Sequence, residues 1–214
     1  MIDFFKTIAE PSSGEFRDRG SKFLAFAYPI ENESEGVIIL EKLRKEHIKA
    51  QHFCFAWRVG ITANLFRAND DGEPSGTAGK PILGQIDSFG VTNIVIIVVR
   101  YFGGTLLGTG GLIHAYREAT REAMSNAIII EKFIEDILIF NFDYTVMPRV
   151  MQAIKKENIP IIHQIFENDC SLTIKMRQSE TEIKLQRLKA HIGNISLEEA
   201  VLKDFLEFGV TVSM

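Results

Sequence analysis

The segment Asn93–Arg100, with the sequence NIVIIVVR, constrains the fold more than any other part of the chain. Its six consecutive β-branched residues, Ile94–Val99, leave no polar face. Such residues favour strands, and a run without alternation is typical of a strand buried on both faces. We therefore predict a central strand with a packed layer on each side of its sheet. The run is far shorter than the about 20 apolar residues that cross a bilayer as a helix, so no membrane association is expected.

A glycine-rich segment, Arg100–Gly111 (RYFGGTLLGTGG), follows this strand and leads into a helical pattern over Leu112–Ala127. Glycine allows positive φ and close approach of a ligand, and the free N–H groups at a helix start favour an anion. This predicts a phosphate or carboxylate site at Thr109–Leu112. A tight turn without a ligand explains the glycines equally well. The segment has neither a GK[ST] sequence nor GxGxxG spacing.

The candidate residues for an anion or a nucleic acid come from this segment and the helix after it. Tyr101 and Phe102 would stack on a base if they were exposed, or would simply pack in the core. The candidates are Arg100, Tyr101, Phe102, Gly103, Gly104, Thr105, Gly108, Thr109, Gly110, Gly111, His114 and Arg117.

A second glycine-bearing segment, Asn69–Pro81 (NDDGEPSGTAGKP), is predicted to be a long loop, and long ordered loops are often functional. Its acidic residues would hold a hard cation or bond to neighbouring backbone N–H groups. EF-hand spacing is absent, which favours a contact surface for a partner over a metal site. The candidate contact residues are Asp70, Asp71, Gly72, Glu73, Pro74, Ser75, Gly76 and Thr77.

The remaining patterns divide the chain into two domains, residues 1–130 and 131–214. In the first, alternation and apolar periodicity predict strands and helices around the central strand. These are strands at Ser21–Ile30, His52–Val59 and Ala63–Arg67, and helices at Ser34–His47, capped by Ser34, and at Ile82–Phe89.

The second domain is predicted to have the order β-α-β-β-α-β, which is the ferredoxin-like arrangement. Residues Ser196–Lys203 fit either a helical turn or an extended segment. The predicted elements are a strand at Phe133–Tyr144, a helix at Pro148–Glu157, strands at Ile159–Phe166 and Cys170–Met176 joined by a turn at residues 167–169, a helix at Ser179–His191 and a strand at Phe205–Val212.

Composition limits the class of protein. A hydrophobic share of 46% is enough for a packed core, and a net charge of −4 argues against tight general binding of duplex nucleic acid. It leaves room for a local basic groove, to which Lys22 and Arg58 would contribute beside Arg100 and Arg117. The two cysteines, far apart in the sequence, are expected to be reduced thiols, and the N-terminus does not resemble a signal peptide, so the expected location is the cytoplasm.

His52 and Cys54 lie two positions apart on a predicted strand and therefore point to the same face. A thiolate beside a histidine would be a nucleophile. No third group that would orient the histidine is evident, so ordinary packing is favoured. We expect no catalytic residues, no metal site and no cofactor.

Four segments together resemble the IMPACT family, in particular its YigZ-like bacterial members. They are Ser21–Ile30, Ala50–Gly60, Asn69–Leu83 and Ile94–Ala119, the last containing the signature VRYFGGTLLG. The resemblance covers about residues 15–125 and is weaker beyond. It implies an α+β fold in which a left-handed βαβ domain like ribosomal-protein domain 2 precedes a ferredoxin-like sandwich.

The resemblance also implies a role in translation. Eukaryotic relatives regulate translation through a further N-terminal domain that this chain does not carry, and no catalytic residues are agreed for the family. The leading hypothesis is a non-enzymatic protein that associates with RNA or the ribosome. The alternatives are a nucleotide- or phosphate-binding protein or enzyme that uses the loop at 103–111, and a module that binds a translation-related protein through Asn69–Pro81. The oligomeric state stays open.

Overall fold

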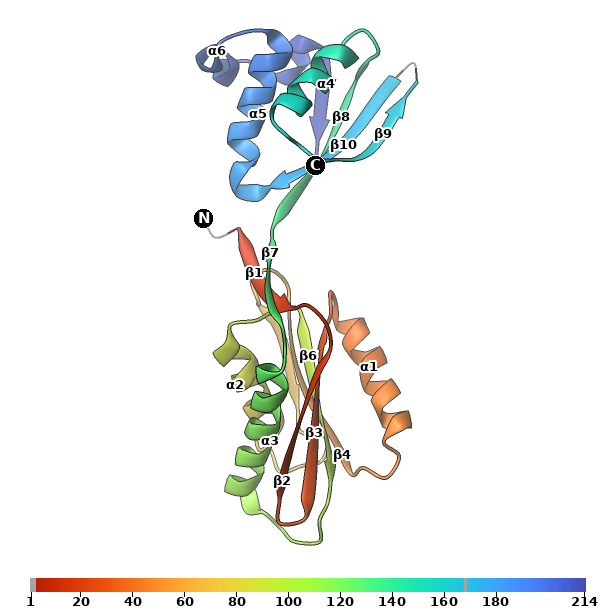
Figure 1. Cartoon of the computed structure of the whole chain (residues 1–214), viewed down its shortest axis with the longest axis vertical. Helices are drawn as coiled ribbons and strands as arrows, with labels where there is room; N and C mark the ends of the chain where they lie inside the picture. Colours follow the sequence, from red (N-terminus) through yellow and green to blue (C-terminus); the bar gives the residue numbers. More distant parts are fainter. Residues whose placement is uncertain (1–2, 168) are drawn as a thin grey trace. The chain divides into compact units, whose positions relative to one another are not determined.

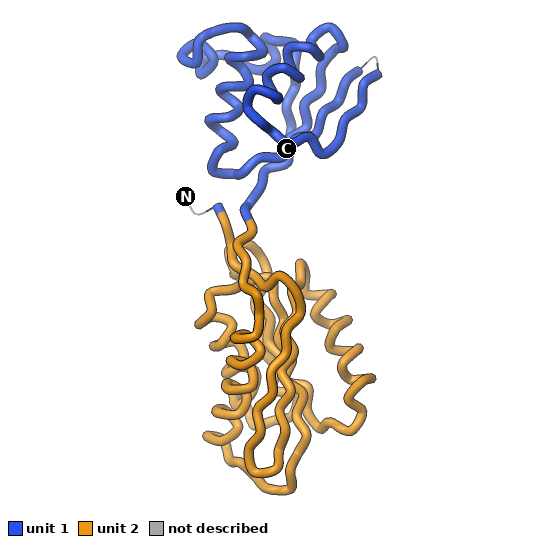
Figure 2. The backbone as a smooth tube through the Cα atoms, viewed as in Figure 1, with its two compact units in different colours: residues 1–3, 133–214 blue, residues 4–132 orange. Residues whose placement is uncertain are grey.

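The computed structural model describes residues 3–167 and 169–214 and divides into two compact units (Figure 2). The larger unit is Phe4–Lys132, and the smaller unit contains residues 3 and 133–214. Buried apolar side chains form separate clusters within the two units, so each unit has a core of its own. A two-stranded sheet pairs β1 (Phe4–Ile8) with β7 (Ile129–Phe133).

An antiparallel five-stranded sheet organises the larger unit, in the order β2-β3-β6-β4-β5. The predicted central strand is confirmed, because β6 lies in the middle and Ile94–Val99 are fully buried. The edge strand β2 has the polar sequence SSGEFRD, which carries no strand signal. The strands are β2 (Ser12–Asp18), β3 (Ser21–Pro29), β4 (His52–Val59), β5 (Leu65–Asn69) and β6 (Ile94–Tyr101).

Helices cover both faces of this sheet (Figure 1). Ile94, Ile96 and Val98 of β6 pack with α2 (Gly79–Phe89) and α3 (Gly108–Ser125). The alternate residues of β6 belong to a second cluster on the side of α1 (Glu33–Glu46). The absence of alternation in the β6 sequence therefore reflects apolar layers on both sides of the strand.

The smaller unit contains an antiparallel four-stranded sheet in the order β11-β8-β10-β9. This is the strand order of a ferredoxin-like sandwich, so the predicted α+β class and its ferredoxin-like second part are confirmed. The elements are β8 (Glu135–Asp143), α4 (Met147–Lys156), β9 (Ile161–Phe166), β10 (Asp169–Arg177), α5 (Gln178–Gly193), α6 (Leu197–Leu202), η1 (Phe205–Phe208) and β11 (Val210–Ser213).

Both helices that follow the glycine-bearing segments start earlier than predicted. α2 begins at Gly79 and α3 at Gly108, where Ile82 and Leu112 were the predicted starts. A Cβ on Gly79 would lie 2.6 Å from the Asn69 nitrogen, so this glycine lets α2 pack directly on the β5 backbone. Thr109 and its two following glycines belong to the first turns of α3 and not to a loop.

Other boundaries also differ. The predicted strand Phe205–Val212 is wrong in its first half, where the capping box between Asp204 and Glu207 closes a 3-10 turn. The cap of α1 is Asn32, not Ser34, because its side chain accepts the Glu35 N–H. The strand predicted at Phe133–Tyr144 is divided between β7 and β8, and Ser196–Lys203 contains helix α6. Asn168 of the predicted turn lies outside the described residues.

No helix among residues 3–167 and 169–214 combines the length and the apolar character that a membrane span needs.

Candidate binding pocket

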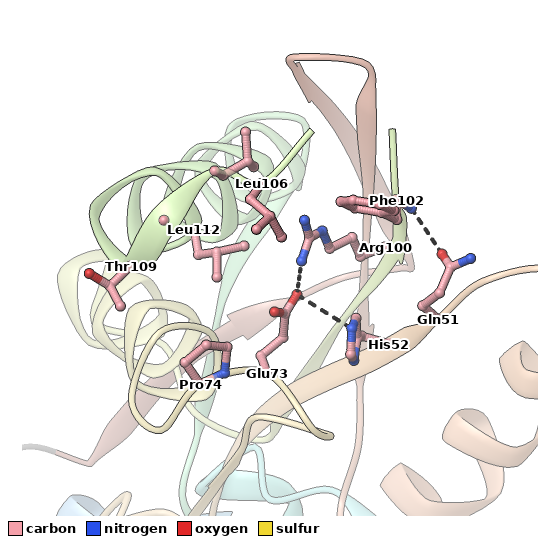
Figure 3. Close-up of a pocket in the computed structure, with 11 residues that line it drawn as sticks. Gln51, His52, Glu73, Pro74, Arg100, Phe102, Leu106, Thr109 and Leu112 are labelled. Atoms are coloured by element: carbon pink, nitrogen blue, oxygen red, sulfur yellow. Dashed lines mark hydrogen bonds and ion pairs between the residues drawn. The ribbon is translucent and has the colours of Figure 1, made fainter. Parts of the chain in front are cut away.

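A pocket of about 460 Å³ lies in the larger unit, between the end of β6, the start of α3 and the loop before α2 (Figure 3). It brings together parts of the two glycine-bearing segments that the sequence singled out. Its lining residues are Gln51, His52, Glu73, Pro74, Arg100, Phe102, Leu106, Leu107, Gly108, Thr109 and Leu112.

The pairing register of the strands determines where two polar side chains of the pocket lie, those of Arg100 and His52. His52 of β4 and Phe23 of β3 are the Cα partners of Arg100 on either side of β6. Residues directly opposite in antiparallel strands share a face, so all three side chains point to the side of α2 and α3. The Arg100 guanidinium carbon lies 5.3 Å from the centre of the Phe23 ring. The guanidinium is therefore within the range of a cation–π contact with Phe23.

Glu73 enters the pocket from the loop and is buried, with its side chain 4% exposed. Its Oε1 accepts hydrogen bonds from Arg100 Nη1 at 2.6 Å and from the Tyr116 hydroxyl at 2.8 Å. His52 Nε2 lies 4.0 Å from the same oxygen (Figure 3). A buried carboxylate needs such partners, because desolvation of an isolated charge is very unfavourable.

The Arg100 side chain is 6% exposed, and its Nε has no hydrogen-bond partner among the described residues. Only one guanidinium nitrogen, Nη1, is bonded to Glu73. Figure 3 shows the other terminal nitrogen directed toward the space beside Leu106. Buried donors without a partner are rare in proteins, and the described residues contain three, at Trp57, Arg100 and Arg177. The one at Arg100 belongs to a side chain that lines this pocket.

The start of α3 provides hydrogen-bond donors at another wall of the pocket. α3 begins after Leu107 without a side-chain cap, so the first N–H groups of the helix are not taken by a capping residue. Gly108 and Thr109, which begin the helix, both line the pocket. The pocket thus combines a helix N-terminus, which favours an anionic group, with a guanidinium whose charge is paired with Glu73 and which has further N–H groups to donate.

Exposed apolar side chains form the rim. Phe102 is 44% exposed and Leu106 is 80% exposed. Phe102 is fixed at its backbone, because its N–H donates to Gln51 Oε1 at 2.9 Å. Its ring centre lies 5.7 Å from the Arg100 guanidinium carbon. An aromatic face beside a cation suits a flat, conjugated ligand.

Cys54 and Tyr116 lie beneath Glu73 and are buried. The Cys54 sulfur lies 3.0 Å from the Asp70 carbonyl oxygen and 3.2 Å from the Tyr116 hydroxyl oxygen, either of which can accept its single proton. Burial strongly raises the pKa of Cys54, and burial also raises the pKa of Tyr116 far above its ordinary value. Cys54 is therefore a neutral core residue, which agrees with the packing interpretation and not with a nucleophile.

The acidic residues of Asp70–Thr77 point inward. The Asp70 carboxylate accepts the N–H groups of Gly76, Ala78 and Gly79. Burial alone would raise the pKa of Asp70, but these three hydrogen bonds outweigh it and lower the pKa. Asp71 accepts the Phe53 N–H at 2.6 Å and pairs with Arg44 at 2.8 Å.

These inward bonds leave little of the predicted contact loop on the surface. The exposed residues of Asp70–Thr77 are Gly72, Pro74 and Ser75. The described residues contain no cluster of three or more His, Cys, Asp or Glu side chains with metal-binding geometry.

The structure does not gather all the predicted cations in one place. Arg58 pairs with Asp87 and Lys22 with Glu15. His114 packs on the Phe16 ring, and Arg117 lines a different hollow, described below. The pocket instead recruits residues that the sequence patterns did not single out, namely Gln51, Leu106, Leu107 and the supporting Tyr116.

Of the remaining candidates, Tyr101 bonds through its hydroxyl to His47, and Gly103 donates its N–H to Ser21. Gly104, Thr105 and Gly110 are exposed, and Gly111 is half-buried.

The chain is thus a two-unit α+β protein with a pocket where two glycine-bearing segments meet. Residues 19–124 match the family model described as the Impact N-terminal domain. The chain is 31% identical over 164 residues to an IMPACT family member of Haemophilus influenzae, covering 76% of this chain and 80% of that one. The chain belongs to the IMPACT family.

Other relatives agree. IMPACT family member YvyE of Bacillus subtilis is 29% identical over 181 residues, covering 85% of this chain and 83% of that protein. IMPACT family member YigZ of Escherichia coli is 42% identical over 106 residues, which span 49% of this chain and 52% of YigZ. A solved structure of a hypothetical protein has a TM-score of 0.71 and 26% identity, covering 99% of this chain and 97% of that one.

Proposed function

We propose that this protein is a non-enzymatic RNA-binding protein that acts in translation in the cytoplasm, and that the pocket holds one phosphate-bearing nucleotide of the RNA. The observation that carries the proposal is the buried Arg100 guanidinium, whose Nε has no partner among the described residues. The phosphate would bond to Arg100 and to the start of α3. The base would stack on Phe102.

Several features of the pocket support a single inserted nucleotide over a bound duplex. The donors line one pocket of about 460 Å³, while Arg58 and Lys22 take part in ion pairs elsewhere. A duplex is held mainly through many phosphates along a basic face. An unpaired nucleotide can insert its base beside an aromatic ring, and that is the common mode of sequence-tolerant RNA binding.

Phe102→Ala is expected to weaken binding of short single-stranded RNA by about 1–3 kcal/mol, the usual contribution of one base–aromatic stack. The measurement is fluorescence anisotropy with a labelled oligonucleotide at two salt concentrations. Phe66→Ala is the matched control, because Phe66 is also exposed on the larger unit and also lies beside an arginine, at 5.2 Å from Arg58. The control should bind like the wild type. An equal loss in both variants, or no RNA binding by the wild type at either salt concentration, would refute the proposal.

A second candidate function, binding of a free nucleotide or other small phosphate compound, is favoured by the pocket volume of about 460 Å³, which is in the usual range of small-molecule sites. A thermal-shift screen of nucleotides with and without Mg²⁺ separates the two functions. A rise in melting temperature with mononucleotides, together with weak binding of RNA, favours the small-molecule function. RNA that binds much more tightly than any mononucleotide favours the first.

A further inference from the structure

A second hollow in the larger unit lies on the other side of the Pro74–Gly76 segment. It is lined by Gly76, Lys80, Pro81, Gly84, Gln85, Ile113 and Arg117. The pocket described above is lined by Pro74, and this hollow is lined by Gly76, so one short turn borders both.

Helix α3 also connects the two hollows. Thr109 lines the first, and Ile113 and Arg117 line the second. These three positions are spaced four residues apart, so they follow one face of the helix. From Thr109 to Arg117 the helix rises by about 12 Å. That distance suits a chain of a few nucleotides and exceeds the size of one phosphate.

The charges in this second hollow are available for a ligand. Lys80 and Arg117 are exposed, and neither takes part in an ion pair within residues 3–167 and 169–214. The acidic groups nearby are engaged elsewhere. Glu118 pairs with Arg121 at 2.8 Å, and the Asp70 carboxylate accepts three backbone N–H groups. No acidic residue lines this hollow.

We infer that the ligand is a single-stranded RNA segment that continues from the Arg100 pocket over the turn at Pro74–Gly76, so that Lys80 and Arg117 each bind one of the next phosphates. The inference rests on the proposed function. It adds the path that the RNA follows on the surface and the statement that this RNA is single-stranded. A nucleotide inserted beside Phe102 must be unpaired, and the next phosphates then run along the exposed face of α3. Although the net charge of the chain is −4, Lys80 and Arg117 supply positive charge locally along the path of the strand.

The test compares uridine monophosphate with a five-nucleotide single-stranded RNA, using the wild type and the double variant Lys80→Glu/Arg117→Glu. The wild type should bind the oligonucleotide more tightly than the monophosphate. The variant should lose at least about tenfold in affinity for the oligonucleotide while its affinity for the monophosphate changes less than about twofold. Loss of two phosphate contacts should also reduce the slope of log affinity against log salt by about 1.4.

Lys6→Glu/Lys132→Glu is the matched control, with the same change in net charge. Both lysines are exposed in the larger unit. Lys6 forms an isolated β-bridge with Val91, near the start of β6, whereas Arg100 lies near the end of that strand. The control should bind the oligonucleotide like the wild type.

Three outcomes overturn the inference: an unchanged affinity in the Lys80/Arg117 variant, an equal loss in the control, or tighter binding of duplex than of single-stranded RNA. If the Phe102 variant loses RNA binding and the Lys80/Arg117 variant does not, the proposed function stands and this path is wrong. If the wild type binds no RNA, both fail.

Discussion

Glu73→Ala is expected to lower the free energy of unfolding by about 3–5 kcal/mol, which is the usual effect of removing one partner from a buried ion pair. The variant would leave the Arg100 guanidinium buried without its carboxylate and would remove the acceptor of the Tyr116 hydroxyl. Urea unfolding at neutral pH, followed by circular dichroism, measures the change.

Two further variants test whether stability is lost because a charge is left buried or simply because an ion pair is broken. Lys203→Ala breaks an exposed pair with Glu207 that has the same 2.6 Å length and keeps Glu207 in its capping box, so it should leave stability close to that of the wild type. Glu73→Leu combined with Arg100→Met removes both buried charges and should recover much of the loss. If Glu73→Ala is no more harmful than Lys203→Ala, the buried pair does not support the pocket as described.

Gly103→Ala is expected to destabilise the larger unit by about 3 kcal/mol or more, because its Cβ would lie 1.9 Å from the Gly20 carbonyl carbon. The obstacle is backbone, which cannot rotate away like a side chain. The same change would also disturb the Gly103 N–H bond to Ser21 and displace Phe102 next to it. Thermal unfolding and RNA binding should therefore both be affected.

Gly110→Ala is the control for the glycine-rich segment. A Cβ at this position meets no atom within 4 Å, and Gly110 lies in helix α3. Alanine is the better helix former, by up to about 1 kcal/mol, so this variant should be as stable as the wild type or more stable. Equal stability of the Gly103 and Gly110 variants would contradict the close approach of the two backbones.

The sequence predicts the scaffold well because its strongest signals come from burial. Ile94–Val99 has no polar face, and the structure encloses that strand between two apolar layers. The helix starts were harder to place. Gly79, Gly108 and Gly110 suggest loops, but they lie inside helices, where Gly79 is needed for close packing on β5.

The pocket could be predicted only in part. Arg100 and Glu73 were candidates for two different sites, an anion site and a contact loop, because their 2.6 Å contact depends on a loop folding back over the sheet. The pairing of His52 with Arg100 depends on strand register, which single-sequence patterns do not determine. Gln51 and Leu106 carry no motif at all. Bonding to neighbouring backbone N–H groups was one of the two predicted roles of the acidic loop residues, and Asp70 has it. The partners of Asp71 are Phe53 and Arg44, which lie on other elements and carry no local signal.

The most direct test of the central claim is an NMR titration of the isotopically labelled protein with a short single-stranded RNA. If one nucleotide enters the pocket, the largest amide shifts should occur at Phe102, Gly108 and Thr109, which line it. Phe66, beside Arg58 in the same unit, should shift little. Shifts confined to the smaller unit, or amides of the pocket that stay unchanged at saturating RNA, would contradict the account.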